Sequence, residues 1–358
     1  MAIGVVDLPE PIRLKIAELE QAIDFETIVS KGGNGHVAIG LNRLLQRRVV
    51  YKFYYWGDGA HVEPKRLAQL ASDHILPVHD AAPLNEEDAY FVTPYCSNGD
   101  LEDALVTARF GPLQAIDVAL QAAAGASYIH GEGFLHRDLK PSNIFCTDDG
   151  KFVIGDFGSI VPIQDEGYGA ALTKHSLIYR PPEDFDGNRY YRQGDVYQIG
   201  MLLYELCGGV LHKNERDWLK PTQQLRYDGL AGYDQQAYAT EIIQNKIKRG
   251  QIFSWDAIPA WVSQRLLSVI RRAVASSMDR RFATVADLVA GLNNVRRQIY
   301  DWRILDGTPC LAVQNKAYRI VEVQGGFRIE KRLSGNWRTE RRLHPQTMRE
   351  AVQLVEHA

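Results

Sequence analysis

The sequence is short of the features that define several protein classes. Only four of its 358 residues are cysteines, and none of them forms a C-x-x-C pair. This spacing argues against a structural zinc site and against a disulfide-stapled secreted fold, and it fits a reducing compartment. The formal net charge is only −3, so the composition as a whole does not indicate a polyanion as the main partner.

Long hydrophobic runs are also missing. The most apolar stretch, DVYQIGMLLYELCGGV, is interrupted by Gln198 and Glu205 and is too short to span a bilayer. The amino-terminal residues lack the basic start and long apolar stretch of a signal peptide. With 45% hydrophobic and 24% charged residues, the composition is that of a globular protein. We therefore expect a cytoplasmic protein with no membrane partner.

What is present is a change of pattern along the chain. Residues 1–24 include a run of helical spacing, which predicts a leader helix. Residues 25–96 are rich in β-branched and aromatic residues, as in RRVVYKFYYW, with one helical stretch at EPKRLAQLA (63–71). Residues 97–298 are mostly helical in pattern. A strand-rich lobe followed by a larger helical lobe is the expected α+β architecture.

The pattern changes again near the carboxyl end. After a linker at 299–308, residues 309–358 contain KAYRIVEV, FRIEKRL and WRTERRL, which predict a three-stranded sheet, and then one helix. This stretch carries nine Lys or Arg and five Glu. We favour a module for docking or dimerisation; nucleic-acid binding by its basic residues and Trp337 is the alternative.

The densest chemistry lies in FLHRDLKPSNIF (134–145) and in GDFGS, which follows it. Asp138 could accept the proton of an attacking hydroxyl, and Lys140 could neutralise charge on a moving phosphoryl group. Asn143 and Asp156 offer hard oxygen ligands that suit Mg²⁺ bound to phosphates. These residue types at this spacing indicate phosphoryl transfer.

Both segments resemble the catalytic and metal-binding loops of eukaryotic-type (Hanks-type) serine/threonine protein kinases. The resemblance covers about residues 25–298. It implies a bilobal protein-kinase fold, ATP and Mg²⁺ as cofactors, and protein Ser or Thr hydroxyls as acceptors. The late segment MDRRFATVADL is similar to bacterial members of this group.

The resemblance also implies roles for residues outside those two loops. Lys52 would position the ATP phosphates and Glu63 would hold Lys52, while Asp195 would brace the backbone of the catalytic loop. The glycine-rich loop SKGGNGHV has Ser30 where the family has its first glycine. The implied nucleotide-binding residues are Ser30, Gly32, Gly33, Gly35, Val37, Val50, Lys52, Thr93, Pro94, Cys96, Phe145 and Asp156.

Regulation and competing functions follow from the same comparison. Arg137 would pair with a phosphate on the activation loop, where Thr173 and Ser176 are candidate phosphorylation sites. We expect autophosphorylation at Thr173 and a substrate-aligning role for Ser176. The alternatives to a signalling or stress-response protein kinase are a pseudokinase scaffold and a small-molecule kinase. For the polar stretch 208–255 we favour a solvated loop over a docking surface.

Overall fold

The structure is a computed structural model of the chain, and it describes residues 8–30, 35–57, 64–170, 176–187 and 189–358, with Ser30 described for its backbone only. The chain divides into two compact units. The first is Met1–Glu102 with Gln121–Gln198, and the second is Asp103–Leu120 with Ile199–Ala358. Within the described ranges, no helix is both long enough and apolar enough to cross a bilayer.

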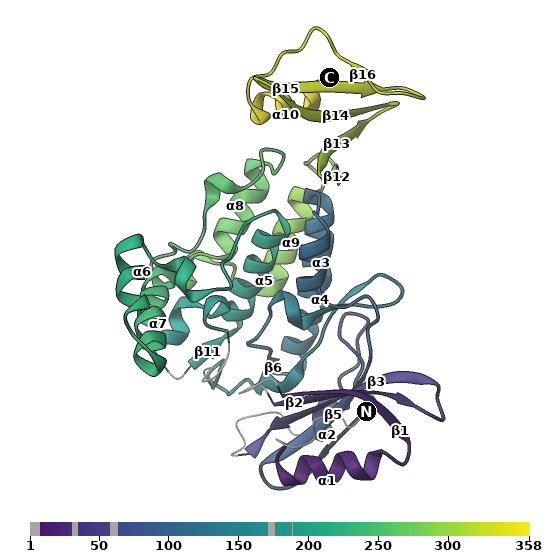
Figure 1. Cartoon of the computed structure of the whole chain (residues 1–358), viewed down its shortest axis with the longest axis vertical. Coiled ribbons are helices and arrows are strands. Elements are labelled where there is room, and N and C mark those ends of the chain that lie inside the picture. The colour runs from purple at the N-terminus through teal and green to yellow at the C-terminus, as the bar shows by residue number, and fades with distance from the viewer. Residues whose placement is uncertain (1–7, 31–34, 58–63, 171–175, 188) are drawn as a thin grey trace. The chain divides into compact units, whose positions relative to one another are not determined.

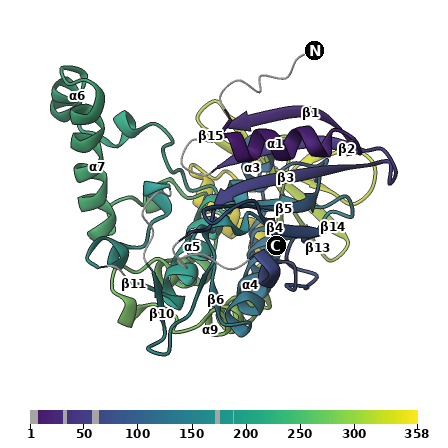
Figure 2. The same cartoon turned by 90° about the horizontal axis from the view of Figure 1, so that it is seen from below.

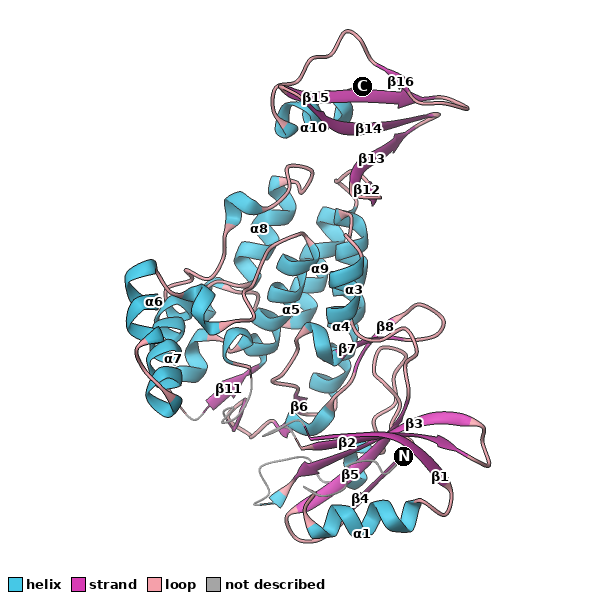
Figure 3. Cartoon of the chain, viewed as in Figure 1, coloured by secondary structure: helices cyan, strands magenta, loops and turns pink. Residues whose placement is uncertain are grey.

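The first unit contains a five-stranded antiparallel sheet with the order β1-β2-β3-β5-β4 (Figures 1 and 3). Its strands are β1 (Ile23–Ser30), β2 (His36–Asn42), β3 (Arg47–Tyr55), β4 (Asp80–Pro83) and β5 (Asp88–Pro94). Helix α1 (Glu10–Leu19) packs on this sheet because Ile12 and Ile16, one turn apart, are buried against Tyr51, Phe53 and Tyr90.

Two sequence expectations for this region need adjustment. The leader helix is present, but the first strand already starts at Ile23, before the boundary expected at residue 24. The helix expected at 63–71 is shorter, since α2 covers only Pro64–Leu67 in the described part of the chain. The Ala68 N–H still donates to the carbonyl four residues back, but the N–H groups of Gln69 and Leu70 donate to carbonyls three residues back, so the turn tightens and the helix ends.

The first unit also contains short paired strands with 3₁₀ turns near them. These strands are β6 (Phe134–Leu135), β7 (Ile144–Cys146), β8 (Phe152–Ile154), β9 (Val161–Pro162), β10 (Tyr168–Ala170) and β11 (Arg189–Tyr191). The pairs are β6 with β9, β7 with β8, and β10 with β11. Each strand has only two or three residues, so the polar loops between them are held close to one another.

Helices dominate the kinase-like part of the second unit. They are α3 (Leu101–Thr107), α4 (Pro112–Gly131), α5 (Arg192–Leu206), α6 (Pro221–Asp228), α7 (Gly232–Lys248), α8 (Gln264–Ala273) and α9 (Val285–Arg296), of which α3, α4 and α5 begin or end in the first unit. Ser263 caps α8 and Thr284 caps α9, each through its side-chain oxygen. Helix α4 is apolar nearly all round, which is typical of a buried helix.

The segment 208–255 corrects one of our expectations. We favoured a solvated loop there, but the segment contains α6 and α7, which pack together (Figure 2). Helix α7 forms because Ala239, Ile243 and Ile247 recur every four residues and are buried on one side. The polar composition of the segment reflects the exposed sides of these helices and not the absence of structure.

The carboxyl-terminal module has five strands instead of the expected three. The sheet order is β12 (Trp302–Leu305), β13 (Thr308–Val313), β14 (Lys316–Val323), β15 (Gly326–Arg332) and β16 (Arg338–Thr339), all antiparallel. The extra hairpin begins inside the segment expected to be a linker. Asp306 and Gly307 form its two-residue turn with φ of 48° and 74°, a Asp-Gly turn signal that we did not use.

Helix α10 (Met348–Glu356) covers one face of this sheet (Figure 1). Val352 and Val355 pack against Ile320, Ile329 and the fully buried Trp302. The indole N–H of Trp302 donates to Glu356 Oε1 at 2.9 Å. The module therefore has its own hydrophobic core, in which the first strand and the last helix of the module are linked.

Candidate active site

The loop after β6 is held by Asp195 in the first turn of α5. The backbone N–H groups of His136 and Arg137 donate to the two Asp195 carboxylate oxygens at 3.0 and 2.9 Å, as we expected. His130 Nε2 lies 2.7 Å from the same carboxylate. Burial by itself would raise the pKa of Asp195, but the hydrogen bond from His130 and the other donors outweigh burial and lower it. Arg137 has φ of 70°, an uncommon conformation that these bonds hold in place.

Gln198, one turn further along α5, holds the next part of the loop. Its Oε1 accepts from the Leu139 N–H at 2.8 Å, and its Nε2 donates to the Arg137 carbonyl at 2.8 Å. The backbone on both sides of Asp138 is therefore fixed by one buried amide. We did not predict this role, although a glutamine inside an apolar helical run was a signal for it.

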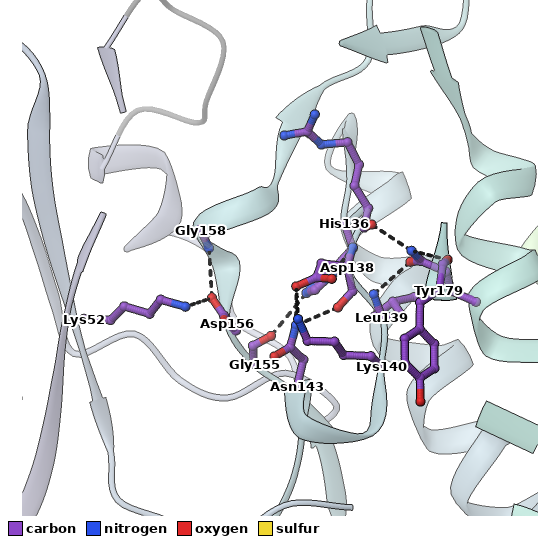
Figure 4. Close-up of polar contacts among 12 residues, drawn as sticks. Lys52, His136, Asp138, Leu139, Lys140, Asn143, Gly155, Asp156, Gly158 and Tyr179 are labelled. Atoms are coloured by element: carbon purple, nitrogen blue, oxygen red, sulfur yellow. Dashed lines mark hydrogen bonds and ion pairs between the residues drawn. The ribbon is translucent and has the colours of Figure 1, made fainter. Parts of the chain in front are cut away.

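Asp138 lies at the centre of the polar cluster in Figure 4. The Lys140 ammonium and the Asn143 side-chain N–H both donate to Asp138 Oδ2, at 2.8 and 2.9 Å. Asn143 also donates to the backbone carbonyl of Asp138 at 2.7 Å. The carboxylate is 2% exposed at the residue level, so its orientation is set by these contacts and not by water.

Lys52 and Asp156 form an ion pair from opposite sides of the site. Lys52 projects from β3 and contacts Asp156 Oδ1, which also accepts from the Gly158 N–H at 3.4 Å (Figure 4). Burial acts to raise the pKa of Asp156, but the Lys52 charge lowers it below its ordinary value. Glu63, the expected partner of Lys52, lies outside the described residues.

His136 links the two loops as a neutral imidazole. Its Nε2 lies 3.2 Å from the Gly155 carbonyl, and its Nδ1 lies 3.3 Å from the Asp138 N–H. A carbonyl only accepts and an N–H only donates, so the proton is on Nε2 and Nδ1 is the acceptor. Burial lowers the pKa of His136, which agrees with this neutral form. The ring also packs edge-on against Phe157.

Asn143 and Asp156 together suit a divalent cation. Asn143 uses its N–H₂ group on Asp138, and Lys52 and the Gly158 N–H both contact Asp156 through Oδ1. In the described chain, this leaves the Asn143 Oδ1 and the Asp156 Oδ2 without a hydrogen-bond donor. No group of three or more His, Cys, Asp or Glu side chains suited to a metal occurs among the described residues. Two oxygen ligands fit Mg²⁺ that retains water and phosphate oxygens.

The residues expected around adenine lie on neighbouring strands of the first sheet. Val37 on β2 is opposite Lys52, and Val50 on β3 is opposite Thr93 on β5. Directly opposite residues share a face of a sheet. Thr93 and Cys96 are buried, and burial raises the pKa of the Cys96 thiol to about 11.

The other expected adenine contacts, Pro94 and Phe145, are half-buried. Pro94 ends β5, and the Phe145 ring lies against Gly155, where an added Cβ would come within 2.6 Å of it. Phe145 therefore lies beside the backbone that leads directly to Asp156. That Pro94 and Cys96 contact the nucleotide stays a prediction.

Of the three glycines in the glycine-rich loop, only Gly35 is among the described residues. Gly32, Gly33 and the Ser30 side chain lie outside the described residues. Gly35 has φ of +87°, and a Cβ there would lie 2.0 Å from the Phe53 carbonyl oxygen. Both the backbone conformation and the close approach to β3 therefore require glycine.

The activation-loop candidates are only partly described. Thr173 lies outside the described residues. Ser176 is half-buried, and among the described residues no hydrogen bond joins its hydroxyl to Asp138 or Lys140. Arg137 donates to the carbonyls of Ser159 and Ala170 at 2.6 and 2.8 Å, and burial lowers its pKa to about 10. The Arg137 side chain thus holds the backbone of the activation loop at Ser159 and at Ala170.

Comparison with known proteins adds family evidence to this geometry. The chain is 27% identical over 214 residues to the interferon-induced, double-stranded RNA-activated protein kinase of Mus musculus, covering 54% of this chain and 42% of that protein. It is 35% identical over 122 residues to the serine/threonine-protein kinase Nek3 of Mus musculus, covering 33% of this chain and 24% of that protein. The matched regions span less than half of either relative. A family model, the protein kinase domain, matches residues 24–289. The chain therefore belongs to the protein kinase domain family.

Proposed function

We propose that this chain is an ATP- and Mg²⁺-dependent protein kinase that phosphorylates serine or threonine hydroxyls. The observation that carries the proposal is the placement of Lys140 and Asn143 on one oxygen of the buried Asp138 carboxylate, at 2.8 and 2.9 Å. Phosphoryl transfer depends on positioning and charge neutralisation, and this cluster supplies both within one loop.

Each residue has a distinct task in the proposed reaction. The acceptor oxygen forms a bond to the γ-phosphorus, the bond from that phosphorus to the bridging oxygen breaks, and ADP leaves. Asp138 orients the acceptor hydroxyl and receives its proton. Lys140 lies beside Asp138 and stabilises negative charge on the transferring group, and Lys52 positions the phosphates of ATP.

Asn143 and Asp156 would hold Mg²⁺. When bound, the ion neutralises charge on the phosphate oxygens. The contacts of Asn143 with Asp138 and of Asp156 with Lys52 mean that each ligand is also tied to a catalytic side chain. Displacement of either ligand would therefore also disturb Asp138 or Lys52.

Protein Ser and Thr hydroxyls are the acceptor class that we favour. Nek3 is named as a serine/threonine-protein kinase, and the other relative is named as a protein kinase. The run HRDLKPSN, with Lys140, is the serine/threonine version of the loop that the family resemblance implies. We further propose a cytoplasmic role in signalling or stress response, which the sequence pattern led us to expect.

A transfer assay with radiolabelled ATP, Mg²⁺ and a general protein acceptor tests the proposal. Asp138→Asn should lower kcat about 10²- to 10⁴-fold because the proton acceptor is lost. Asp149→Asn is the matched control, because this exposed aspartate contacts its near neighbours Lys151 and Thr147 in the described part of the chain. Equal activity of the Asp138→Asn variant and the wild type would refute the assignment.

The same assay separates the two alternative functions. If the chain were a pseudokinase scaffold, neither the wild type nor the Asp138→Asn variant would turn over ATP. A small-molecule kinase would transfer label to a metabolite fraction and leave proteins unlabelled. The presence of Asp138, Asn143 and Asp156 in one described site favours turnover over a scaffold.

Autophosphorylation is the proposed activating step. Arg137 donates to two backbone carbonyls of the activation loop, and we propose that a phosphate on Thr173 adds a charged contact with this guanidinium group. Phosphopeptide mapping after incubation with ATP and Mg²⁺ should find Thr173 modified, with Ser176 unmodified. Full activity of a protein with unmodified Thr173 would contradict this step.

A further inference from the structure

The carboxyl-terminal sheet has one face covered by α10 and one face lined by arginine. Residues directly opposite across antiparallel strands share a face, so the row Trp302, Leu311 and Tyr318 marks the buried side under α10. The adjacent row lies on the other side and runs Arg303, Cys310, Arg319, Glu330 and Thr339. Arg328 and Arg332 share this face, because each is two residues from Glu330 on β15.

These arginines are held in defined positions. Glu330 is 6% exposed, accepts from Arg319 Nε at 2.7 Å, and forms an ion pair with Arg328, whose Nε lies 2.9 Å from Glu330 Oε1. The guanidinium groups of Arg319 and Arg332 stack over the Trp337 ring, at 4.7 and 4.6 Å from its centroid. A side chain that is already ordered loses less entropy when it binds a ligand.

The charge of this face is locally positive despite the net charge of the chain. It carries four arginines, Arg303, Arg319, Arg328 and Arg332, and one glutamate, Glu330. Arg303 is also paired with Asp301 at the start of the sheet. Exposed Arg338, Arg341 and Arg342 follow in the next segment. The arginines of this face therefore outnumber its carboxylates, and the face has the charge to bind an anion.

The spacing of the charges indicates an extended anion. Arg328 and Arg332 are four residues apart on one strand, which corresponds to about 13 Å. Arg303 and Glu330 lie three strands apart, about 14 Å across the sheet. A single phosphate cannot contact all of these groups, whereas a polymer of phosphates can.

We propose that this face, defined by Arg303, Arg319, Arg328, Arg332 and Trp337, binds double-stranded DNA. Its arginines would contact the backbone phosphates that flank the major groove, which is about 12 Å wide. The A-form duplex of RNA has a deep, narrow major groove that excludes such a surface. Two guanidinium groups already lie over the Trp337 ring, so this ring is a poor platform for stacking single-stranded bases.

Fluorescence anisotropy of the full chain with a labelled DNA duplex tests this proposal. The double variant Arg328→Gln/Arg332→Gln removes two charges but leaves Arg319 to hold Glu330 and Trp337. We expect binding to weaken about tenfold or more and the slope of log K against log salt to become less steep by about 2. Kinase activity on a general substrate should stay at the wild-type level.

Matched controls separate the arginine face from total charge. The double variant Arg249→Gln/Arg349→Gln removes the same charge from two exposed positions. Arg249 lies at the end of α7 and Arg349 lies on α10, and this variant should leave DNA binding unchanged. Arg328→Lys/Arg332→Lys should restore most of the affinity and the salt slope. Thermal unfolding of each variant checks that the module remains folded.

Four outcomes would overturn the proposal. These are the absence of duplex binding at low salt, equal weakening by the two Gln pairs, preference for RNA or single-stranded DNA, and preference for an acidic phosphorylated polypeptide over duplex DNA. The last outcome would assign the face to a protein partner.

Discussion

Leu139 and Gln198 are joined by a 2.8 Å hydrogen bond in which the Leu139 N–H donates to the Gln198 side chain. The same side chain donates to the Arg137 carbonyl, so the peptide groups on both sides of Asp138 depend on one residue of α5. Gln198 is 1% exposed, and water cannot replace it. The geometry of the catalytic loop is therefore set by a helix that is distant from it in sequence.

Replacement of Gln198 by leucine should weaken both folding and catalysis. The variant keeps the side-chain volume but leaves a buried N–H and a buried carbonyl without partners. We expect the free energy of unfolding to fall by about 2 to 4 kcal/mol, with a parallel loss of kcat. Urea denaturation and phosphate transfer measure the two effects. Gln236→Leu, at an exposed position on α7, is the control, and an equally small effect of both changes would contradict the role of Gln198.

The neutral state of His136 predicts a dependence of stability on pH. Its folded-state pKa is lowered from the ordinary value of 6.5, mainly by burial, although the nearby Asp195, Asp138 and Asp156 oppose this. As the pH falls below 6.5, the unfolded chain therefore takes up a proton that the folded chain does not yet bind. The free energy of unfolding falls as the pH drops from 6.5 towards and through the folded-state pKa. Protonation of Nδ1 would also displace the Asp138 N–H.

Urea unfolding between about pH 8 and pH 5 tests this dependence. The wild type should lose stability steadily over this range. His136→Gln should be less stable at the upper end but show a smaller further loss on acidification. An unchanged pH slope in the variant would assign the effect to other groups, such as His36, whose pKa is also lowered by burial.

Removal of Lys52 should affect Asp156 as well as ATP. In Lys52→Met, the buried Asp156 loses the charge that lowers its pKa, so that pKa should rise. We expect kcat to fall about 10²- to 10³-fold, together with weaker ATP binding measured by calorimetry. Lys151→Met removes the lysine of an exposed Lys–Asp pair and should change neither quantity. Normal ATP turnover by the Lys52→Met variant would contradict the role of Lys52 in positioning the ATP phosphates.

Substitution of Gly35 separates backbone strain from steric conflict. Gly35 and Gly150 both have positive φ, +87° and +79°, but only Gly35 has a neighbour that an added Cβ would strike. Gly150→Ala should cost about 1 to 2 kcal/mol of stability through strain alone and keep activity.

Gly35→Ala carries the same backbone strain. In addition, the added Cβ must move away from the Phe53 carbonyl oxygen on β3. We expect kcat/KM for ATP to fall about 10²-fold, because small displacements of reacting groups are costly. Steady-state kinetics of both variants provide the comparison. Similar kinetics in the two variants would show that the contact with Phe53 has no catalytic consequence.

Chemistry that lies within a few residues could be predicted from the chain. Asp138, Lys140 and Asn143 lie within six consecutive positions, so no fold can place them far apart. In the structure, Lys140 and Asn143 both donate to one oxygen of the Asp138 carboxylate. Alternation of residues predicted β14 and β15 for the same reason, because a strand is a local pattern. The missed hairpin at Asp306–Gly307 was equally local, and its turn signal was in the sequence.

Contacts between distant segments required the folded chain. Gln198 lies 59 residues from Leu139, and in the sequence it is only a polar residue within an apolar helix. The Lys52 contact with Asp156, and the stacking of Arg319 and Arg332 on Trp337, depend on strand register and loop closure. Residue types specify which groups can react or pair, but only packing decides which of them meet, because burial excludes water and leaves each polar group the partners within its reach.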